Sequence, residues 1–233
     1  AIAMAQAQTG EFAAAVQTAQ TIASKDLQKS ALCGITVAQA QTGEREAAGA
    51  TFAAAVQTAQ TIGGGLGFFK AQALADIAVA QAQAGERETA GVTFAAARRT
   101  AQAIGANDLQ KWALCGIAVS QARAREFTAA VQTARAIADE KMRAEALREI
   151  AVAQARAQEF AAAVQTAQAI VDKADQEWAL QHIVKAQTQA GEFAAAVQTA
   201  QVIADEKERV NALQDIVEAP IQAEEREAAG ATF

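Results

Sequence analysis

One string, Phe-Ala-Ala-Ala-Val-Gln-Thr-Ala, recurs with few changes along this 233-residue chain. The phenylalanines that anchor the repeat are Phe12, Phe52, Phe94, Phe127, Phe160, Phe193 and Phe233. Their successive spacings are 40, 42, 33, 33, 33 and 40 residues. A period of this length is typical of arrays in which each unit packs only on its neighbours. The chain is therefore predicted to consist of 33-residue units, some of which carry an insertion.

Apolar residues within each unit recur at spacings of three and four, which place them on one face of an α-helix. A leucine and an isoleucine three residues apart mark six units: Leu32/Ile35, Leu74/Ile77, Leu114/Ile117, Leu147/Ile150, Leu180/Ile183 and Leu213/Ile216. Alanine, the strongest helix former, is abundant, and strand-favouring residues are scattered. The pattern predicts an all-α fold with two helices in each unit, for example at about 11–23 and 27–41.

Polar and small residues mark the expected helix ends. Asp139, Asp172 and Asp205 occupy one equivalent position, where aspartate can accept hydrogen bonds from the first backbone N–H groups of the next helix. Gly10 and Gly191 precede the anchor phenylalanine and can adopt the left-handed conformation that ends many helices. Pro220 is expected to kink or end its helix. Residues 63–69 are expected to form a long turn whose two phenylalanines pack into the adjacent seam.

Three units carry seven additional residues, at 44–52, 86–94 and 225–233. Seven residues turn a helix by about 700°, about 20° short of two full turns, so the apolar face keeps its direction. We interpret the insertion as a helix that is two turns longer. An enlarged loop is the alternative, because Gly49, Gly91 and Gly230 lie within the inserted segments.

The organisation indicates a single helical-repeat domain over residues 1–233, with about six repeats plus partial ends. The sequence starts in the second helix of one unit and stops on the anchor of another. We therefore expect a segment of a longer array, or a segment whose ends dock onto neighbours.

Charge and hydropathy argue against several functions. The net charge is −6 and the pI about 5.0, with bases and acids interspersed, so nucleic acid is not expected as a partner. No apolar run reaches the length of about 18 residues that a membrane span requires. His182 is the only histidine. No metal site, cofactor, catalytic residue or enzyme activity is predicted.

Cys33 and Cys115 occupy equivalent positions two repeats apart. Because packed helices lie about 8–10 Å apart, the two residues should be separated by roughly 20 Å and remain thiols. Thiols favour a cytoplasmic location only weakly, and the localisation stays unknown.

Read from Ala31, the unit runs Ala-Leu-x-x-Ile-x-x-Ala-x-Ala, and uninterrupted units continue towards Gly-Glu-Phe-x-x-Ala-Val. This pattern resembles the tetratricopeptide repeat. Ile183 falls at the family's first-helix leucine, Gly191 at its turn glycine, Phe193 at its turn aromatic and Ala196 at its small second-helix residue. This sequence departs from the family pattern in two ways. Its unit has 33 residues, and glutamines stand at positions where the family has an aromatic residue: Gln39, Gln81, Gln121, Gln154 and Gln187. The resemblance implies a right-handed α-solenoid of antiparallel helix pairs, whose first helices line a concave surface.

The repeats differ most along the helix that corresponds to residues 27–41, which is the first helix of the pair in the resembled family. Three varying positions share one helix face: Ser30, Gln72, Trp112, Glu145, Trp178 and Asn211; then Cys33, Ala75, Cys115, Arg148, Gln181 and Gln214; then Val37, Val79, Val119, Val152, Lys185 and Glu218. They match the concave positions of the resembled family. The candidate partner-binding residues are Trp112, Cys115, Arg148, Trp178, Gln181, Lys185 and Gln214. Packing of both tryptophans at seams between repeats is the alternative.

Two functions fit these observations. The first is a non-enzymatic scaffold that binds a peptide or protein on the concave helix face. The second is a structural repeat protein that self-associates end to end into oligomers or filaments. A helical-repeat RNA binder fits less well, because the charge is acidic and no basic stripe is present.

Overall fold

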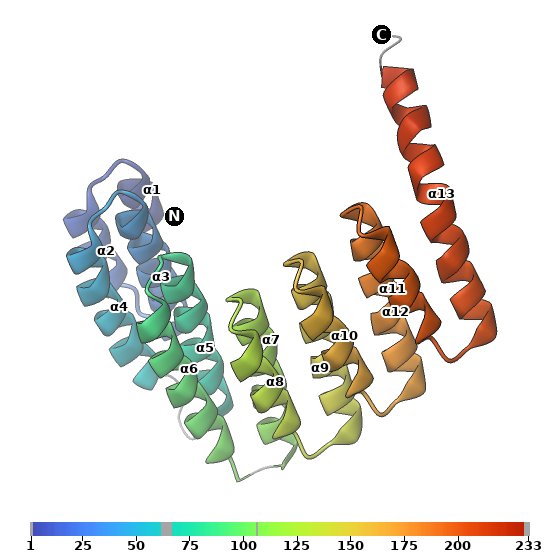
Figure 1. The fold of residues 1–233 in the computed structure, drawn as a ribbon. Coiled ribbons are helices and arrows are strands. Elements are labelled where there is room, and N and C mark those ends of the chain that lie inside the picture. The colour runs from blue at the N-terminus through green and yellow to red at the C-terminus, as the bar shows by residue number, and fades with distance from the viewer. Residues whose placement is uncertain (1, 62–66, 106, 231–233) are drawn as a thin grey trace. The chain divides into compact units, whose positions relative to one another are not determined.

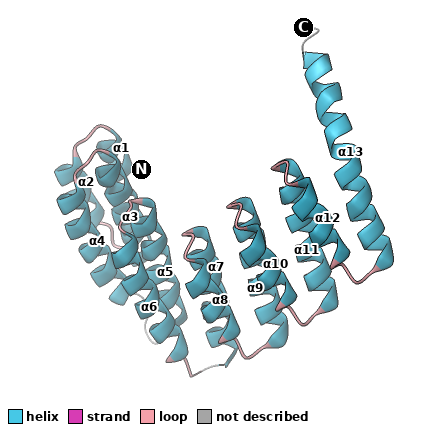
Figure 2. Cartoon of the chain, viewed as in Figure 1, coloured by secondary structure: helices cyan, strands magenta, loops and turns pink. Residues whose placement is uncertain are grey.

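The computed structural model describes residues 2–61, 67–105 and 107–230, and within them every regular element is helical (Figures 1 and 2). The prediction of an all-α fold is therefore confirmed for the described chain. The helices are α1 (Ile2–Gln8), α2 (Phe12–Gln20), α3 (Lys25–Gln41), α4 (Arg45–Gln60), α5 (Gly67–Gln83), α6 (Arg87–Gln102), α7 (Asn107–Arg123), α8 (Phe127–Arg135), α9 (Glu140–Arg156), α10 (Phe160–Gln168), α11 (Lys173–Gln189), α12 (Phe193–Gln201) and α13 (Glu206–Gly230).

The chain forms two compact units, residues 1–136 with α1 to α8 and residues 137–233 with α9 to α13. Inside each unit the helices pack in chain order. In the first unit α3 contacts α1, α2, α4 and α5, and α5 also contacts α6 and α7. In the second unit α11 contacts α9, α10, α12 and α13. The helices α3, α5, α7, α9, α11 and α13 are called the long helices below. The long helices at the centres of the two units, α3, α5 and α11, are thus covered by the helices next to them in sequence.

Alanine makes up much of the core, because the helices that contain an anchor phenylalanine (α2, α4, α6, α8, α10 and α12) present alanines to their neighbours. Two alanines four residues apart are fully buried in every one of these helices: Ala15/Ala19, Ala55/Ala59, Ala97/Ala101, Ala130/Ala134, Ala163/Ala167 and Ala196/Ala200. The long helices contribute the repeated isoleucines, such as Ile77 and Ile150, which are also fully buried. A side chain of one carbon lets helix axes approach closely, so the repeat combines strong helix propensity with tight packing.

The turns that follow the long helices share one backbone geometry. Gly10, Gly43, Gly85 and Gly191 have φ between 79° and 89°, which confirms the prediction for Gly10 and Gly191. The residue after each turn closes a hydrogen bond to a glutamine carbonyl, as from Glu192 N to Gln187 O at 2.9 Å. This is the Schellman arrangement of helix C-termini. Arg125 and Gln158 take the same left-handed conformation, with φ of 62° and 63°.

The predicted aspartate caps are present. Asp139 Oδ1 accepts a hydrogen bond from Met142 N at 2.9 Å, and Asp172 and Asp205 make the equivalent bond at the starts of α11 and α13. In the first unit Ser24 occupies this role at α3. These bonds satisfy backbone donors that the helix itself leaves unpaired.

The insertions at 44–52 and 86–94 lengthen helices, as predicted. α4 and α6 contain 16 residues, whereas the equivalent α2, α8, α10 and α12 contain nine. The difference is the seven inserted residues. Ala48 and Ala90 within the additional turns are fully buried, as are the anchors Phe52 and Phe94 four residues later, so the added turns keep the apolar face.

Two local features differ from the expectations. Of the two outcomes expected at Pro220, an end of the helix does not occur: α13 continues to Gly230, so no separate helix begins at the third insertion, of which residues 231–233 lie outside the described chain. The turn position there holds Glu224 rather than glycine, and a helix continues more readily through glutamate. Within 63–69, residues 63–66 lie outside the described chain. Gly67–Phe69 start α5, and Phe69 is half exposed rather than packed in a seam.

Candidate binding groove on α11 and α13

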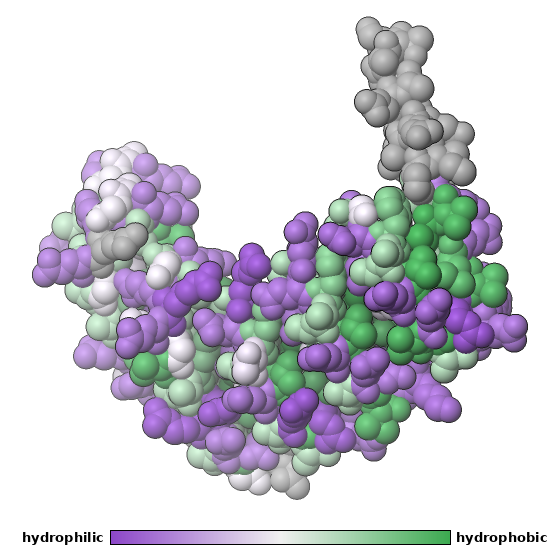
Figure 3. Space-filling model, viewed as in Figure 1, coloured by the Kyte–Doolittle hydropathy of each residue, from purple (hydrophilic) through white to green (hydrophobic). Residues whose placement is uncertain are grey.

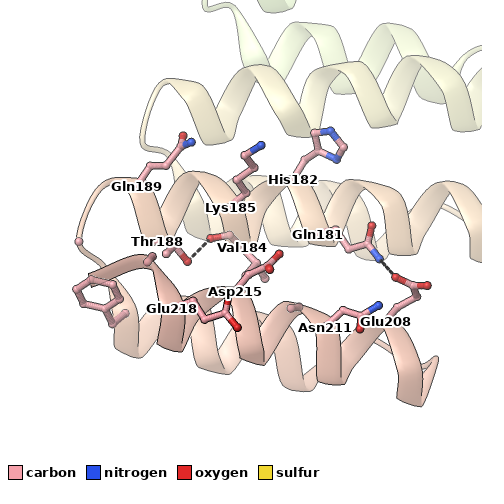
Figure 4. A pocket seen from close by; sticks show the side chains of 14 residues that line it. Gln181, His182, Val184, Lys185, Thr188, Gln189, Glu208, Asn211, Asp215 and Glu218 are labelled. Atoms are coloured by element: carbon pink, nitrogen blue, oxygen red, sulfur yellow. Dashed lines mark hydrogen bonds between the residues drawn. The ribbon is translucent and has the colours of Figure 1, made fainter. Parts of the chain in front are cut away.

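A groove of about 960 Å³ lies in the second unit between α11 and α13 (Figure 4), and Phe193 of α12 is also among the residues that line it. α11 and α13 are successive long helices that pack side by side, and each forms one wall of the groove. The polar side chains of the α11 wall are Gln181, His182, Lys185, Thr188 and Gln189, and those of the α13 wall are Glu208, Asn211, Asp215 and Glu218.

Part of the polarity of this groove comes from one repeat position that is apolar in the earlier repeats. Lys185 and Glu218 are equivalent to Val37, Val79, Val119 and Val152. Lys185 is exposed, whereas Val152 is buried. Substitution of valine by charged residues therefore distinguishes the last two long helices from the earlier ones.

The charges of the groove are mainly negative. Glu208, Asp215 and Glu218 are acidic, and Lys185 is the basic residue among those that line it. Gln181 Nε2 donates to Glu208 Oε2 at 2.7 Å, and Gln214 Nε2 donates to Glu218 Oε1 at 2.7 Å. Figure 4 shows Asp215 projecting from α13 into the space shared with α11. The arrangement suits a ligand that brings positive charge and hydrogen-bond donors.

Three side chains stack next to the groove. The guanidinium carbon of Arg148 lies 4.7 Å from the centroid of the Trp178 ring, within the range of a cation–π interaction. The His182 ring stacks on Trp178 with centroids 3.6 Å apart. Arg148 is held in turn by Asp175, with 3.0 Å between Nη1 and Oδ1. Trp178 is thus fixed by α9 and by its own helix while 37 % of its surface stays exposed.

The structure brings most of the predicted site residues of the second unit together. Gln181 and Lys185 line the groove, Arg148 and Trp178 form the adjacent stack, and Gln214 bonds a residue of the wall. Trp112 and Cys115 belong to α7 of the first unit, where Trp112 is 54 % exposed and Cys115 is partly buried. They do not belong to this groove.

Sequence reasoning did not select Glu208 and Asp215. Both lie on one stripe of α13 with Asn211 and Glu218, at offsets of 3, 7 and 10 residues from Glu208. A comparison of whole helix stripes between repeats, rather than of three positions, could have found them.

Within the described residues no group of three or more His, Cys, Asp or Glu side chains is arranged to hold a metal ion. Among the described helices, none combines the length and apolar character needed to cross a membrane. Neither cysteine takes part in a disulfide.

No protein-family model and no curated protein matches this sequence. Among solved structures, the chain is similar to the crystal structure of Ton1535 from Thermococcus onnurineus NA1, with 14% sequence identity and a TM-score of 0.42. The alignment covers 87% of this chain and 84% of that one. This TM-score is too low to define a shared fold.

Proposed function

We propose that this chain is a non-enzymatic interaction scaffold that binds a peptide or protein partner along its long helices. In this proposal the 33-residue repeats form a right-handed α-solenoid of antiparallel helix pairs, similar to tetratricopeptide repeats. Its support is the packing of successive long helices on each other within each compact unit, together with the 33-residue sequence period.

The observation that carries the proposal is the groove between α11 and α13. Its walls hold side chains that vary among otherwise near-identical repeats, and variation on a constant scaffold is where binding specificity resides. Trp178 lies beside this groove with part of its ring exposed, and tryptophan is enriched among residues that dominate binding energy.

The expected partner is a segment that carries lysine or arginine. Three carboxylates and one lysine line the groove, so an acidic segment would be repelled and a basic one attracted. Attraction between partly exposed charges weakens as the ionic strength rises. Binding of a basic segment in this groove should therefore weaken when salt is added.

The test is a titration with two labelled peptides, one of alternating lysine and alanine and one of alternating glutamate and alanine, followed by fluorescence anisotropy. We expect only the lysine peptide to bind. The variant with both Asp215→Asn and Glu218→Gln should bind it about tenfold more weakly, which corresponds to about 1.4 kcal/mol. Glu206→Gln is the matched control, because Glu206 is exposed on the same helix outside the groove. Equal binding of both peptides, or an unaffected double variant, would contradict the proposal.

The two tryptophans allow the site to be located. In Trp112→Phe the remaining emission comes from Trp178, and it should change when the lysine peptide binds. In Trp178→Phe the emission of Trp112 should stay constant. A change in the emission of Trp112 alone would indicate that the peptide binds at α7 instead.

A second candidate function is end-to-end self-association of the repeats. The exposed valines Val210 and Val217 of α13 favour it.

A further inference from the structure

The anchor phenylalanines of the repeats differ in how deeply they are buried. In the first unit Phe12, Phe52 and Phe94 are exposed by 7 % or less. In the second unit Phe160 is half-buried, and Phe193 is 40 % exposed. The helices that carry these anchors each contact the long helix before them and the long helix after them, and α12 contacts α11 and α13 in the same way. The exposure of Phe193 therefore needs a cause in the neighbouring side chains.

The thirteenth residue of the flanking long helices supplies that cause. For Phe52 this residue is valine on both sides. For Phe160 it is valine on one side and Lys185 on the other, and for Phe193 it is Lys185 and Glu218. Charged side chains keep their ends in water and cover an aromatic ring less well than valine does. The exposure of the anchor accordingly increases with the number of charged neighbours.

Phe193 and the carboxylate of Glu208 lie toward different ends of the groove. Phe193 starts α12 directly after the turn that follows α11, so it lies toward the C-terminal end of α11, near Thr188. Figure 4 shows Thr188 and Glu218 toward one end of the groove, and Gln181 with Glu208 toward the other. The groove thus combines an acidic end with an end that carries an exposed aromatic ring.

The length of the groove suits a short extended segment. The wall formed by α13 reaches from Glu208 to Ala219, and at 1.5 Å for each helical residue it is about 17 Å long. An extended chain advances by about 3.3 Å for each residue, so about five residues span this wall. Such a segment can place one side chain at Glu208 or Asp215 and another at Phe193.

Phe193 is the large apolar surface of this groove. Val184 and Ala212 also line it, but they are only 2 % and 5 % exposed. Removal of apolar surface from water is favourable, and an aromatic ring offers a large area for it. A partner that carried charge alone would leave the ring of Phe193 uncovered.

We propose that Phe193 forms an apolar subsite, and that the partner is an extended segment of about five residues with lysine or arginine at one end and a large apolar side chain at the other. The carboxylates of Glu208 and Asp215 select the basic residue, and the ring of Phe193 selects the apolar one. This inference rests on the proposed binding of a basic segment and names the second feature that the partner must carry.

The test compares two peptides of equal charge. In the lysine–alanine peptide a terminal lysine is replaced by leucine or by asparagine, which have similar sizes but differ in polarity. The exchange is made at each end in turn, so that both directions of binding are covered. Fluorescence anisotropy with the parent chain should show that leucine at one of the two ends gives about fivefold tighter binding than asparagine.

Three variants assign this preference to the ring. Phe193→Ala should bind the leucine and asparagine peptides equally and keep the affinity of the parent chain for the asparagine peptide. Lys185→Val places the valine of the earlier repeats beside the ring, so it should also lower the preference although Phe193 is unchanged. Val202→Ala is the control, because Val202 is 44 % exposed at the end of the same helix but does not line the groove. If circular dichroism shows that Phe193→Ala is unfolded, Lys185→Val decides.

The outcomes separate this inference from the proposed function. Equal affinity of the parent chain for the leucine and asparagine peptides would overturn the apolar subsite and leave the binding of basic segments intact. A preference that persists in folded Phe193→Ala and in Lys185→Val would also overturn it, because leucine would then bind elsewhere. Absence of binding of every lysine-containing peptide would overturn the proposed function and this inference with it.

Discussion

Arg148 and Asp175 lie 27 residues apart and join α9 to α11 by a hydrogen bond of 3.0 Å between Nη1 and Oδ1. The same separation joins Gln181 to Glu208 across α11 and α13, at 2.7 Å. One repeat position thus forms a polar link to the following helix twice in the second unit. At the equivalent places of the first unit the residues are Cys33 with Phe69 and Ala75 with Leu109, which cannot form such a link.

Replacement of Asp175 by asparagine should lower the free energy of unfolding by about 1–2 kcal/mol, because a charge-assisted bond to a largely buried guanidinium is lost. Arg148 Nε is already without a hydrogen-bond partner, so the remaining bonds of this group carry more weight. Urea denaturation followed by circular dichroism measures the change. Asp108→Asn is the control, since the Asp108 side chain is exposed in its pair with Lys111 and the loss of the pair should cost less than about 0.5 kcal/mol. Equal effects of the two substitutions would show that the link between α9 and α11 adds no stability.

Gln158→Gly should stabilise the chain by roughly 0.5–1 kcal/mol. Gln158 has φ of 63°, and a side chain in the left-handed region is strained where glycine is not. The reverse change, Gly191→Gln, tests the same turn one repeat later, where a Cβ would meet no atom within 4 Å. It should destabilise the chain by a similar amount through backbone strain alone. Urea midpoints that move in the same direction for both variants would contradict this explanation.

Deletion of residues 45–51 should convert α4 into a nine-residue helix like α2 and preserve the fold. Removal of seven residues rotates the chain by about 700°, so Phe52 returns to nearly the same direction. Deletion of 46–51 instead rotates the preceding residues by about 600° and misplaces them by roughly a third of a turn. Circular dichroism and urea unfolding should show a cooperative transition for the first variant and a much weaker or broader one for the second. Similar stability of both variants would mean that helical phase is unimportant here.

The Cys33 thiol should react slowly in the folded chain. Burial raises the pKa of Cys33 from its ordinary 9.0 to about 12, while Lys29 lowers it and Asp76 raises it by smaller amounts. Because the thiolate is the nucleophile, iodoacetamide at pH 8.5 should label Cys33 about tenfold or more slowly in the native chain than in urea. Peptide mapping by mass spectrometry separates Cys33 from Cys115.

The same raised pKa of Cys33 predicts a pH dependence of stability. The unfolded thiol ionises near pH 9 and the folded thiol near pH 12, so the contribution of the neutral thiol is complete below about pH 9. It is lost as the pH rises from about 9 to about 12. The difference in unfolding free energy between the parent chain and Cys33→Ala should therefore decrease over that window. A constant difference would indicate that Cys33 ionises as readily in the folded chain as in the unfolded one.

Local features of this protein follow from short stretches of sequence. The helices, the aspartate caps at 139, 172 and 205, and the glycine turns at 10 and 191 depend on residues within one helical turn of each other. The seven-residue lengthening of α4 follows from helical periodicity alone. Arg125 and Gln158 show the limit of residue type as a guide, because the hydrogen-bonded turn at the end of the helix holds them in a conformation that glycine prefers.

The candidate sites were decided by tertiary packing. The sequence by itself determined that Trp178, Gln181 and Lys185 share a face of α11, because helical spacing needs no further information. Only the packing of α11 against α9 and α13 placed Arg148 on Trp178 and brought Glu208 and Asp215 into the groove that Lys185 also lines, and it left Val217 exposed. Those relationships depend on which faces of separate helices meet. That choice is made by burial of apolar surface across the whole unit, which no local stretch of sequence specifies.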